Sequence, residues 1–98
     1  MSTRREQLLK ATRVGQVTRF NEFKSLIEHF GFRLASMNRL HNIFVHERMP
    51  ELINLQNIDG LVKPFQVRQV LNLVYKYQLR ASDEPDSIVP IFDPEAMP

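Results

Sequence analysis

The stretch HNIFVHERMPELINLQNIDGLVKP, residues 41–64, decides the fold of this chain. His41 to Glu47 is rich in apolar and aromatic residues and predicts a strand, and Leu52 to Gln56 predicts the next one. Arg48-Met49-Pro50 separates the two strands, because proline is rarely tolerated inside a sheet. Consecutive strands with so short a link favour antiparallel pairing.

The preceding segment adds a helix and another strand. Phe20 to Phe30 carries apolar residues at the spacing of one helix face, and Gly31 stands where a left-handed C-terminal cap is expected. The members of this face are Phe20, Phe23, Leu26, Ile27 and Phe30. Their helical spacing indicates core packing rather than a platform for stacking bases. Phe32 to Ser36 then predicts a strand, and Asn38 to Leu40 predicts a turn region.

A second helix follows the strands. Asp59-Gly60 predicts a turn, and Lys63-Pro64 opens the helix, since proline is well tolerated at the first helical position. Its expected buried stripe is Val67, Val70, Leu71 and Val74. The predicted fold class is therefore α+β, in the order helix, three-stranded antiparallel sheet, helix (α-β-β-β-α), with both helices covering one sheet face.

The 98 residues make one domain with an uneven charge. Residues 1–80 hold 13 Lys/Arg and six Asp/Glu, a formal charge of +7, whereas residues 81–98 hold five acids and no base, a charge of −5. A basic body suits phosphate backbones, because each neutralised phosphate releases counterions. The alternative is an ordinary solvated basic surface. We divide the chain into a basic N-terminal extension (1–18) with a candidate short helix (4–14), a central domain (19–80) and an acidic, proline-rich tail (81–98).

The tail contains a short apolar cluster, Ile88 to Phe92, between its prolines. Two interpretations stay open. Either the cluster docks in a groove of its own domain or of a neighbour, or the tail is mostly disordered, as its composition favours.

Composition narrows the chemistry. The chain has no cysteine and three histidines, which excludes thiol catalysis, disulfides and cysteine-based zinc sites. We expect no metal and no cofactor. Met1 to Lys10 lacks the apolar run of a signal peptide, and no segment approaches the ~20 apolar residues that span a bilayer. We therefore expect a cytoplasmic protein with no membrane partner.

Several of these segments together resemble the HicA family of bacterial toxins over about residues 19–80. The matching segments are Phe30 to Leu34, His41, Ile43-Phe44, His46, Pro50 to Gln56 and Lys63 to Leu71. The resemblance implies a fold like the double-stranded RNA-binding domain. It also implies the toxin of a type II toxin-antitoxin system: a metal-independent endoribonuclease (an mRNA interferase, hence a hydrolase) that cleaves mRNA until a HicB-type antitoxin blocks it. His41 occupies the place of the family's catalytic histidine, whereas Arg39-Leu40 replace the preceding Gly-Ser pair and Asn42 replaces a frequent second histidine.

The residue types themselves also permit RNA cleavage without a metal. RNA is cut without a metal when a base removes the 2′-OH proton, the oxygen attacks the adjacent phosphorus, and cations hold the developing charge. An imidazole is suited to this at neutral pH. We assign His41 as the candidate catalytic base or acid, and Arg39, Lys63 and Arg68 as candidate phosphate-binding residues. His46 lies five residues beyond His41, so it points to the opposite sheet face and is expected to be structural or rim-forming rather than the partner acid.

Two alternatives to the ribonuclease stay open. One is a non-catalytic RNA-binding or regulatory module with the same fold and basic surface. The other is a protein-interaction module, in which Ile88 to Phe92 mediates assembly into a homo-oligomer or docking of the antitoxin. The unexceptional interpretation of His41 is a histidine at a strand edge or on the surface.

Overall fold

The computed structural model describes residues 3–38 and 40–84. Two predicted features lie outside this range: the phosphate-binding role of Arg39, and the docking of the apolar cluster Ile88 to Phe92. The elements are α1 (Arg4–Ala11), β1 (Thr18–Arg19), α2 (Phe20–Glu28), β2 (Arg33–Met37), β3 (His41–His46), β4 (Met49–Gln56), β5 (Leu61–Val62) and α3 (Pro64–Lys76).

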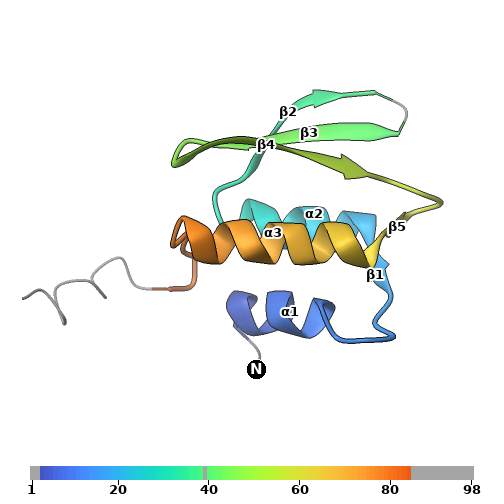
Figure 1. The fold of residues 1–98 in the computed structure, drawn as a ribbon, viewed down its shortest axis with the longest axis horizontal. Coiled ribbons are helices and arrows are strands. Elements are labelled where there is room, and N and C mark those ends of the chain that lie inside the picture. Colours follow the sequence, from blue (N-terminus) through green and yellow to red (C-terminus); the bar gives the residue numbers. More distant parts are fainter. Residues whose placement is uncertain (1–2, 39, 85–98) are drawn as a thin grey trace, which may run out of the picture.

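The described chain forms three layers (Figure 1). The antiparallel sheet β2-β3-β4 is the first, α2 and α3 lie together against one of its faces, and α1 lies on the far side of those helices. Phe44 sits at the centre of the sheet, paired with Leu34 on one side and Ile53 on the other. The predicted α+β class is confirmed. In the sequence, α2 precedes and α3 follows the three strands of the antiparallel sheet.

Helix α2 forms as its apolar spacing predicts. Phe20, Phe23, Leu26 and Ile27 are all buried, and Phe30 is buried just beyond the helix. Gly31 then adopts a φ of +93°, the left-handed conformation that ends the helix and turns the chain toward β2. The predicted helix face and its glycine cap are both confirmed.

Helix α3 begins at Pro64, as predicted, and buries one stripe. Val67, Val70 and Val74 are fully buried, and Leu71 is partly buried beside them. Val62 and Val67 occupy the two positions of a hydrophobic staple, and both belong to the core. With 13 residues, α3 is the longest described helix, and no helix in the described ranges is long and apolar enough to cross a bilayer.

The boundary of β4 corrects the prediction. The strand was expected to begin at Leu52, after a break at Arg48-Met49-Pro50, but it begins at Met49 and includes Pro50. β4 is an edge strand that pairs only with β3 within its sheet. Pro50 is therefore tolerated, because a residue on an edge strand does not have to donate a ladder hydrogen bond.

Sequence patterns did not reveal the small second sheet. β1 and β5 pair antiparallel, with Thr18 opposite Val62. Two residues are too few for a periodicity signal. The turn at Asp59-Gly60, which leads into β5, was predicted; both residues have positive φ, as the commonest tight hairpin turns require.

The N-terminal segment is a structural layer rather than a loose arm. Thr3 and Glu6 form a reciprocal capping box at the start of α1, and Leu8 is fully buried in the main core. The guanidinium of Arg5 reaches the segment that follows α3, where it forms an ion pair of 2.7 Å with Glu84 and donates to the carbonyl of Leu79 at 2.8 Å. Both ends of the described chain are thus fastened to each other.

Candidate functional site

The candidate site lies on the sheet face that the helices leave open. Residues of β3 alternate, so that Asn42, Phe44 and His46 point into the core while His41 and Ile43 point outward. Within the described ranges no helix or strand covers this outward face (Figure 1). His41 is partly buried there, at the first residue of the strand, where the β2–β3 turn ends.

Asn54 holds the ring of His41 from the neighbouring strand. The distance from His41 Nδ1 to Asn54 Oδ1 is 3.1 Å. Because an amide oxygen only accepts hydrogen bonds, Nδ1 donates, and a neutral ring then carries its lone pair on Nε2. Among the described residues Nε2 has no hydrogen-bond partner. The ring is therefore oriented, and the nitrogen able to accept a proton faces away from its anchor.

Two further contacts fix the backbone around this ring. The amide of His41 donates to the side-chain oxygen of Asn38 at 3.1 Å, and the amide of Asn38 donates to the carbonyl of His41 at 2.9 Å. This reciprocal pair closes the β2–β3 turn. The first residue of β3 is consequently held from both its side chain and its main chain.

Gln66 connects this site to α3. It is buried in the first turn of the helix; its Nε2 donates to the carbonyl of Asn54 at 2.7 Å, and its Oε1 accepts from the amide of Gln56 at 3.1 Å. A helix side chain therefore positions the backbone of Asn54, whose own side chain positions His41.

The predicted phosphate-binding residues Lys63 and Arg68 are exposed near the start of α3. That helix end, the β2–β3 turn and the end of β4 all lie at the same end of the domain, on the right of Figure 1. Lys63 and Arg68 belong to the helix layer, however, whereas His41 faces outward from the sheet layer. An RNA that reached all three would have to follow this end of the domain across both layers.

His46 has the structural place expected for it, on the inward face opposite to His41. It is buried, with Nε2 2.8 Å from the carbonyl oxygen of Phe30 and Nδ1 accepting from the amide of Arg48 at 3.0 Å. Its ring meets that of Phe32 edge-on. All its ring nitrogens are engaged, so it supports the fold at the α2–β2 turn.

Shifted carboxyl and amino pKa values occur at the other end of α3, where a three-residue cluster joins the helix to β4. Tyr77 donates a short hydrogen bond to Glu51, and Lys76 lies 3.0 Å from the same carboxylate. The hydrogen bond from Tyr77, then that from Lys76, lowers the pKa of Glu51, while Glu51 raises the pKa of both partners. The cluster joins α3 to β4 near the start of that strand, whereas His41 pairs with Gln56 at the other end of β4.

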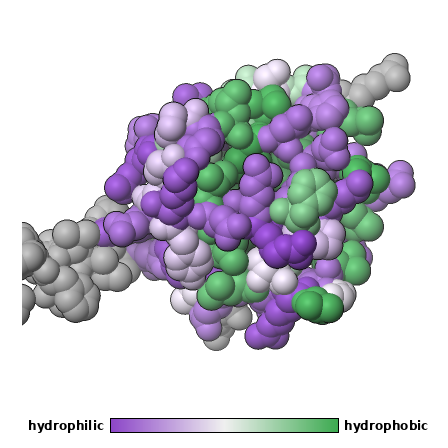
Figure 2. Space-filling model, viewed as in Figure 1, coloured by the Kyte–Doolittle hydropathy of each residue, from purple (hydrophilic) through white to green (hydrophobic). Residues whose placement is uncertain are grey.

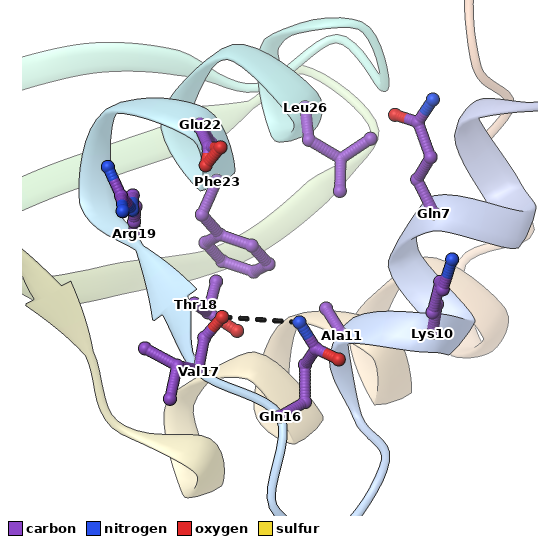
Figure 3. Close-up of a pocket in the computed structure, with 10 residues that line it drawn as sticks. All are labelled: Gln7, Lys10, Ala11, Gln16, Val17, Thr18, Arg19, Glu22, Phe23 and Leu26. Carbon is purple, nitrogen blue, oxygen red and sulfur yellow. Dashed lines mark hydrogen bonds between the residues drawn. The ribbon is translucent and has the colours of Figure 1, made fainter.

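A hollow of about 190 Å³ lies between α1 and the start of α2 (Figure 3). Phe23 forms part of its apolar wall, and Lys10, Arg19 and Glu22 contribute charged groups of both signs. Gln16 Nε2 donates to the carbonyl of the adjacent Val17, and both residues line the hollow. Of the predicted site residues that the structure describes, His41, Lys63 and Arg68, none lines this hollow. Its mixed charge favours no single class of ligand.

Sequence reasoning missed Asn54 and Gln66. Gln66 stands four residues before Val70, at a position of the buried stripe, and a polar residue at such a position signals a buried hydrogen-bonding role. Asn54 carries no comparable signal, because an outward-facing asparagine in an edge strand is common. Only the strand register, which places Asn54 opposite Ile43 and diagonal to His41, reveals it.

Comparisons with known proteins give no match: no protein-family model fits the sequence, and neither the curated proteins nor the solved structures contain a significant similarity to it.

Proposed function

We propose that this protein is a HicA-like endoribonuclease that cleaves RNA without a metal, with His41 as the general base. The observation that carries the proposal is the oriented ring: Asn54 accepts from Nδ1, which leaves the lone pair of Nε2 on the open face of the sheet. A base in that position is what transfer of a proton from a ribose hydroxyl requires. The resemblance to the HicA family supplies the same assignment independently, and with it a fold like the double-stranded RNA-binding domain.

The reaction in this proposal is an internal transesterification. Nε2 of His41 takes the 2′-OH proton, the 2′ oxygen forms a bond to the adjacent phosphorus, and the bond from phosphorus to the 5′ oxygen breaks. The leaving 5′ oxygen takes a proton from water, and the hydroxide that forms removes the proton from His41, which restores the neutral imidazole. The products are a 2′,3′-cyclic phosphate and a 5′-hydroxyl. Arg39, Lys63 and Arg68 are the cations proposed to hold phosphates, because guanidinium and ammonium groups stabilise their charge.

In biological terms the proposal is a toxin of a type II toxin-antitoxin system, acting on mRNA in the cytoplasm and restrained by a HicB-type antitoxin. These points rest on the resemblance between residues 19–80 and the HicA family. They are separable from the chemistry, since a purified ribonuclease would show its activity without the antitoxin.

The identity of the nucleophile gives the sharpest test of this reaction. We would incubate the protein with an RNA and with its fully 2′-O-methylated counterpart, and determine the ends of the products. The proposal expects cyclic phosphate ends from the RNA and no cleavage of the methylated strand. Cleavage of both strands, or 5′-phosphate products, would contradict a reaction that uses the 2′ oxygen.

A second candidate is a non-catalytic RNA-binding or regulatory module. The replacement of the family's Gly-Ser pair by Arg39-Leu40 favours it, because leucine offers neither the backbone freedom of glycine nor the hydroxyl of serine beside a phosphate. RNA binding that persists in His41→Ala, with no cleavage by either protein, would identify this module.

A further inference from the structure

Phe65 stands apart from the other phenylalanines of the described chain. Five of the six are buried to 5% exposure or less, whereas Phe65, the second residue of α3, is 54% exposed. Burial of such a side chain stabilises a fold. The fold forgoes this contribution at Phe65.

Neither helix initiation nor the core accounts for Phe65. Pro64 supplies the favoured first residue of α3, and Val62 and Val67 fill the staple positions. Phenylalanine itself is a poor helix former compared with leucine or glutamine. The aromatic ring is therefore an addition to the surface at this end of the domain.

The charged residues nearest to Phe65 along α3 are basic. Two of the four Lys/Arg in residues 60–82, Lys63 and Arg68, lie near the start of the helix, whereas Lys76 pairs with Glu51 at its other end. Asp59, in the turn before β5, is the nearest acid in the chain. Lys63 precedes Phe65 by two residues, and Arg68 follows it by three, which places Arg68 beside it on the helix surface. Both cations are exposed and have no hydrogen-bond or ion-pair partner among the described residues.

A shallow hollow lies at the turn that precedes Phe65 in the chain. Its volume is about 270 Å³, and four apolar residues and one charge of each sign line it: Ile58, Asp59, Leu61, Val62, Lys63 and Pro64. Leu61 is 42% exposed. On the molecular face along which α3 runs, apolar residues lie among hydrophilic ones (Figure 2). An aromatic ring with adjoining apolar surface and flanking cations matches what a nucleotide presents: a flat base between charged phosphates.

We propose that Phe65 stacks on an unpaired base of single-stranded RNA, while Lys63 and Arg68 hold the phosphates on either side of it. This inference rests on the proposed function in taking RNA as the ligand, and it adds which form of RNA is bound and where. A duplex keeps its bases stacked on one another, so an exposed aromatic ring selects unpaired nucleotides. The stacked base lies at the same end of the domain as His41, and it anchors the strand that passes toward the sheet.

The test compares two ligands that differ only in their bases. We would measure by fluorescence anisotropy the binding of a short oligouridine and of an abasic oligomer with the same sugar-phosphate length. Wild type should bind oligouridine more tightly. Phe65→Ala should weaken the binding of oligouridine at least about fivefold and leave that of the abasic oligomer within about twofold, because only the former loses a stacking partner. Phe65→Trp should restore the preference.

Two controls separate stacking from charge and from general damage. Leu9→Ala removes another exposed apolar side chain, on α1, and should change neither affinity. Lys63→Ala and Arg68→Ala should weaken both ligands about equally and reduce the salt dependence of binding. Circular dichroism establishes that each variant is folded.

The inference is overturned if Phe65→Ala weakens both ligands equally or leaves oligouridine binding unchanged, or if wild type binds neither ligand. Its failure is distinguishable from that of the ribonuclease proposal. Cleavage of RNA by a folded Phe65→Ala variant with unchanged oligouridine affinity would reject the stacking role alone. Base-dependent binding through Phe65 without any cleavage by wild type would reject the ribonuclease and leave the stacking role in place.

Discussion

Asn54 and His41 face each other diagonally across β4 and β3, with Asn54 Oδ1 3.1 Å from His41 Nδ1. The contact joins the exposed side-chain amide of Asn54 to the partly buried imidazole of His41. Both lie on the sheet face that no helix or strand of the described ranges covers. Gln66 of α3 in turn holds the backbone of Asn54 by donating to its carbonyl. The candidate site is thus one oriented ring supported by two residues from two other elements.

Asn54→Ala should lower the rate of RNA cleavage by roughly tenfold, as part of the contribution a general base makes. Asn54→Asp should retain more activity and move the acidic limb of the pH–rate profile to higher pH, because a carboxylate stabilises the protonated imidazole. Rates measured from about pH 5 to pH 9 check both. A purely structural role for Asn54 would leave the shape of the profile unchanged.

Gln66→Leu should lower the free energy of unfolding by about 1–3 kcal/mol, because it leaves the amide of Gln56 and the carbonyl of Asn54 without this partner inside the protein. Urea denaturation measures the loss. Gln69→Leu, three residues further along α3 and exposed, is the matched control and should change stability little. Equal stability of the two variants would show that the buried bridge contributes nothing.

Glu84→Gln should destabilise the protein at pH 7 by about 0.5–1.5 kcal/mol, the scale of a partly exposed pair with Arg5. The hydrogen bond from Arg5 lowers the pKa of Glu84 below its ordinary value of 4.5. The stabilisation is therefore complete above pH 4.5 and is lost as the pH falls through the lower pKa of the folded protein. Thermal melts should show wild type and variant converging as the pH falls through this range. A difference that stays constant with pH would contradict the assignment.

Gly31→Ala should destabilise the protein by about 1–3 kcal/mol. A Cβ at this position would lie 2.6 Å from His46 Nε2, whose hydrogen bond to the carbonyl of Phe30 resists displacement. Gly15→Ala provides the comparison, since Gly15 also has positive φ but no atom within 4 Å of an added Cβ. The excess loss in Gly31→Ala over Gly15→Ala measures the clash. Similar losses in both would assign the whole effect to backbone strain.

The main elements could be predicted from the sequence because their signals are local. The spacing of Phe20, Phe23 and Ile27 fixes α2, and Lys63-Pro64 marks the start of α3. The limits of β4 could not be predicted, because whether Pro50 is tolerated depends on which strand lies at the sheet edge. The pairing of β1 with β5 and the docking of α1 depend on contacts between distant residues, such as Arg5 with Glu84.

The candidate site was predictable in its central residue and not in its support. The chain has three histidines, and His41 stands out because it opens a strand. That His41 and His46 lie on opposite sheet faces follows from the alternation of side chains along a strand. Asn54 and Gln66 matter only through register and helix placement, which local patterns do not contain. Phe65 was not part of the predicted stripe, and its position two residues before Val67, about 200° around the helix, places its ring on the face away from the core.

The central claim is most directly tested by incubating purified protein with a long single-stranded RNA in EDTA, with wild type and His41→Ala compared side by side and their folding checked by circular dichroism. The account predicts that wild type cleaves the RNA and that the folded variant is slower by about 10²–10⁴-fold, the usual contribution of a general base. Equal cleavage by both proteins, or none by wild type while RNA is still retained in a gel shift, would contradict a ribonuclease that acts through His41.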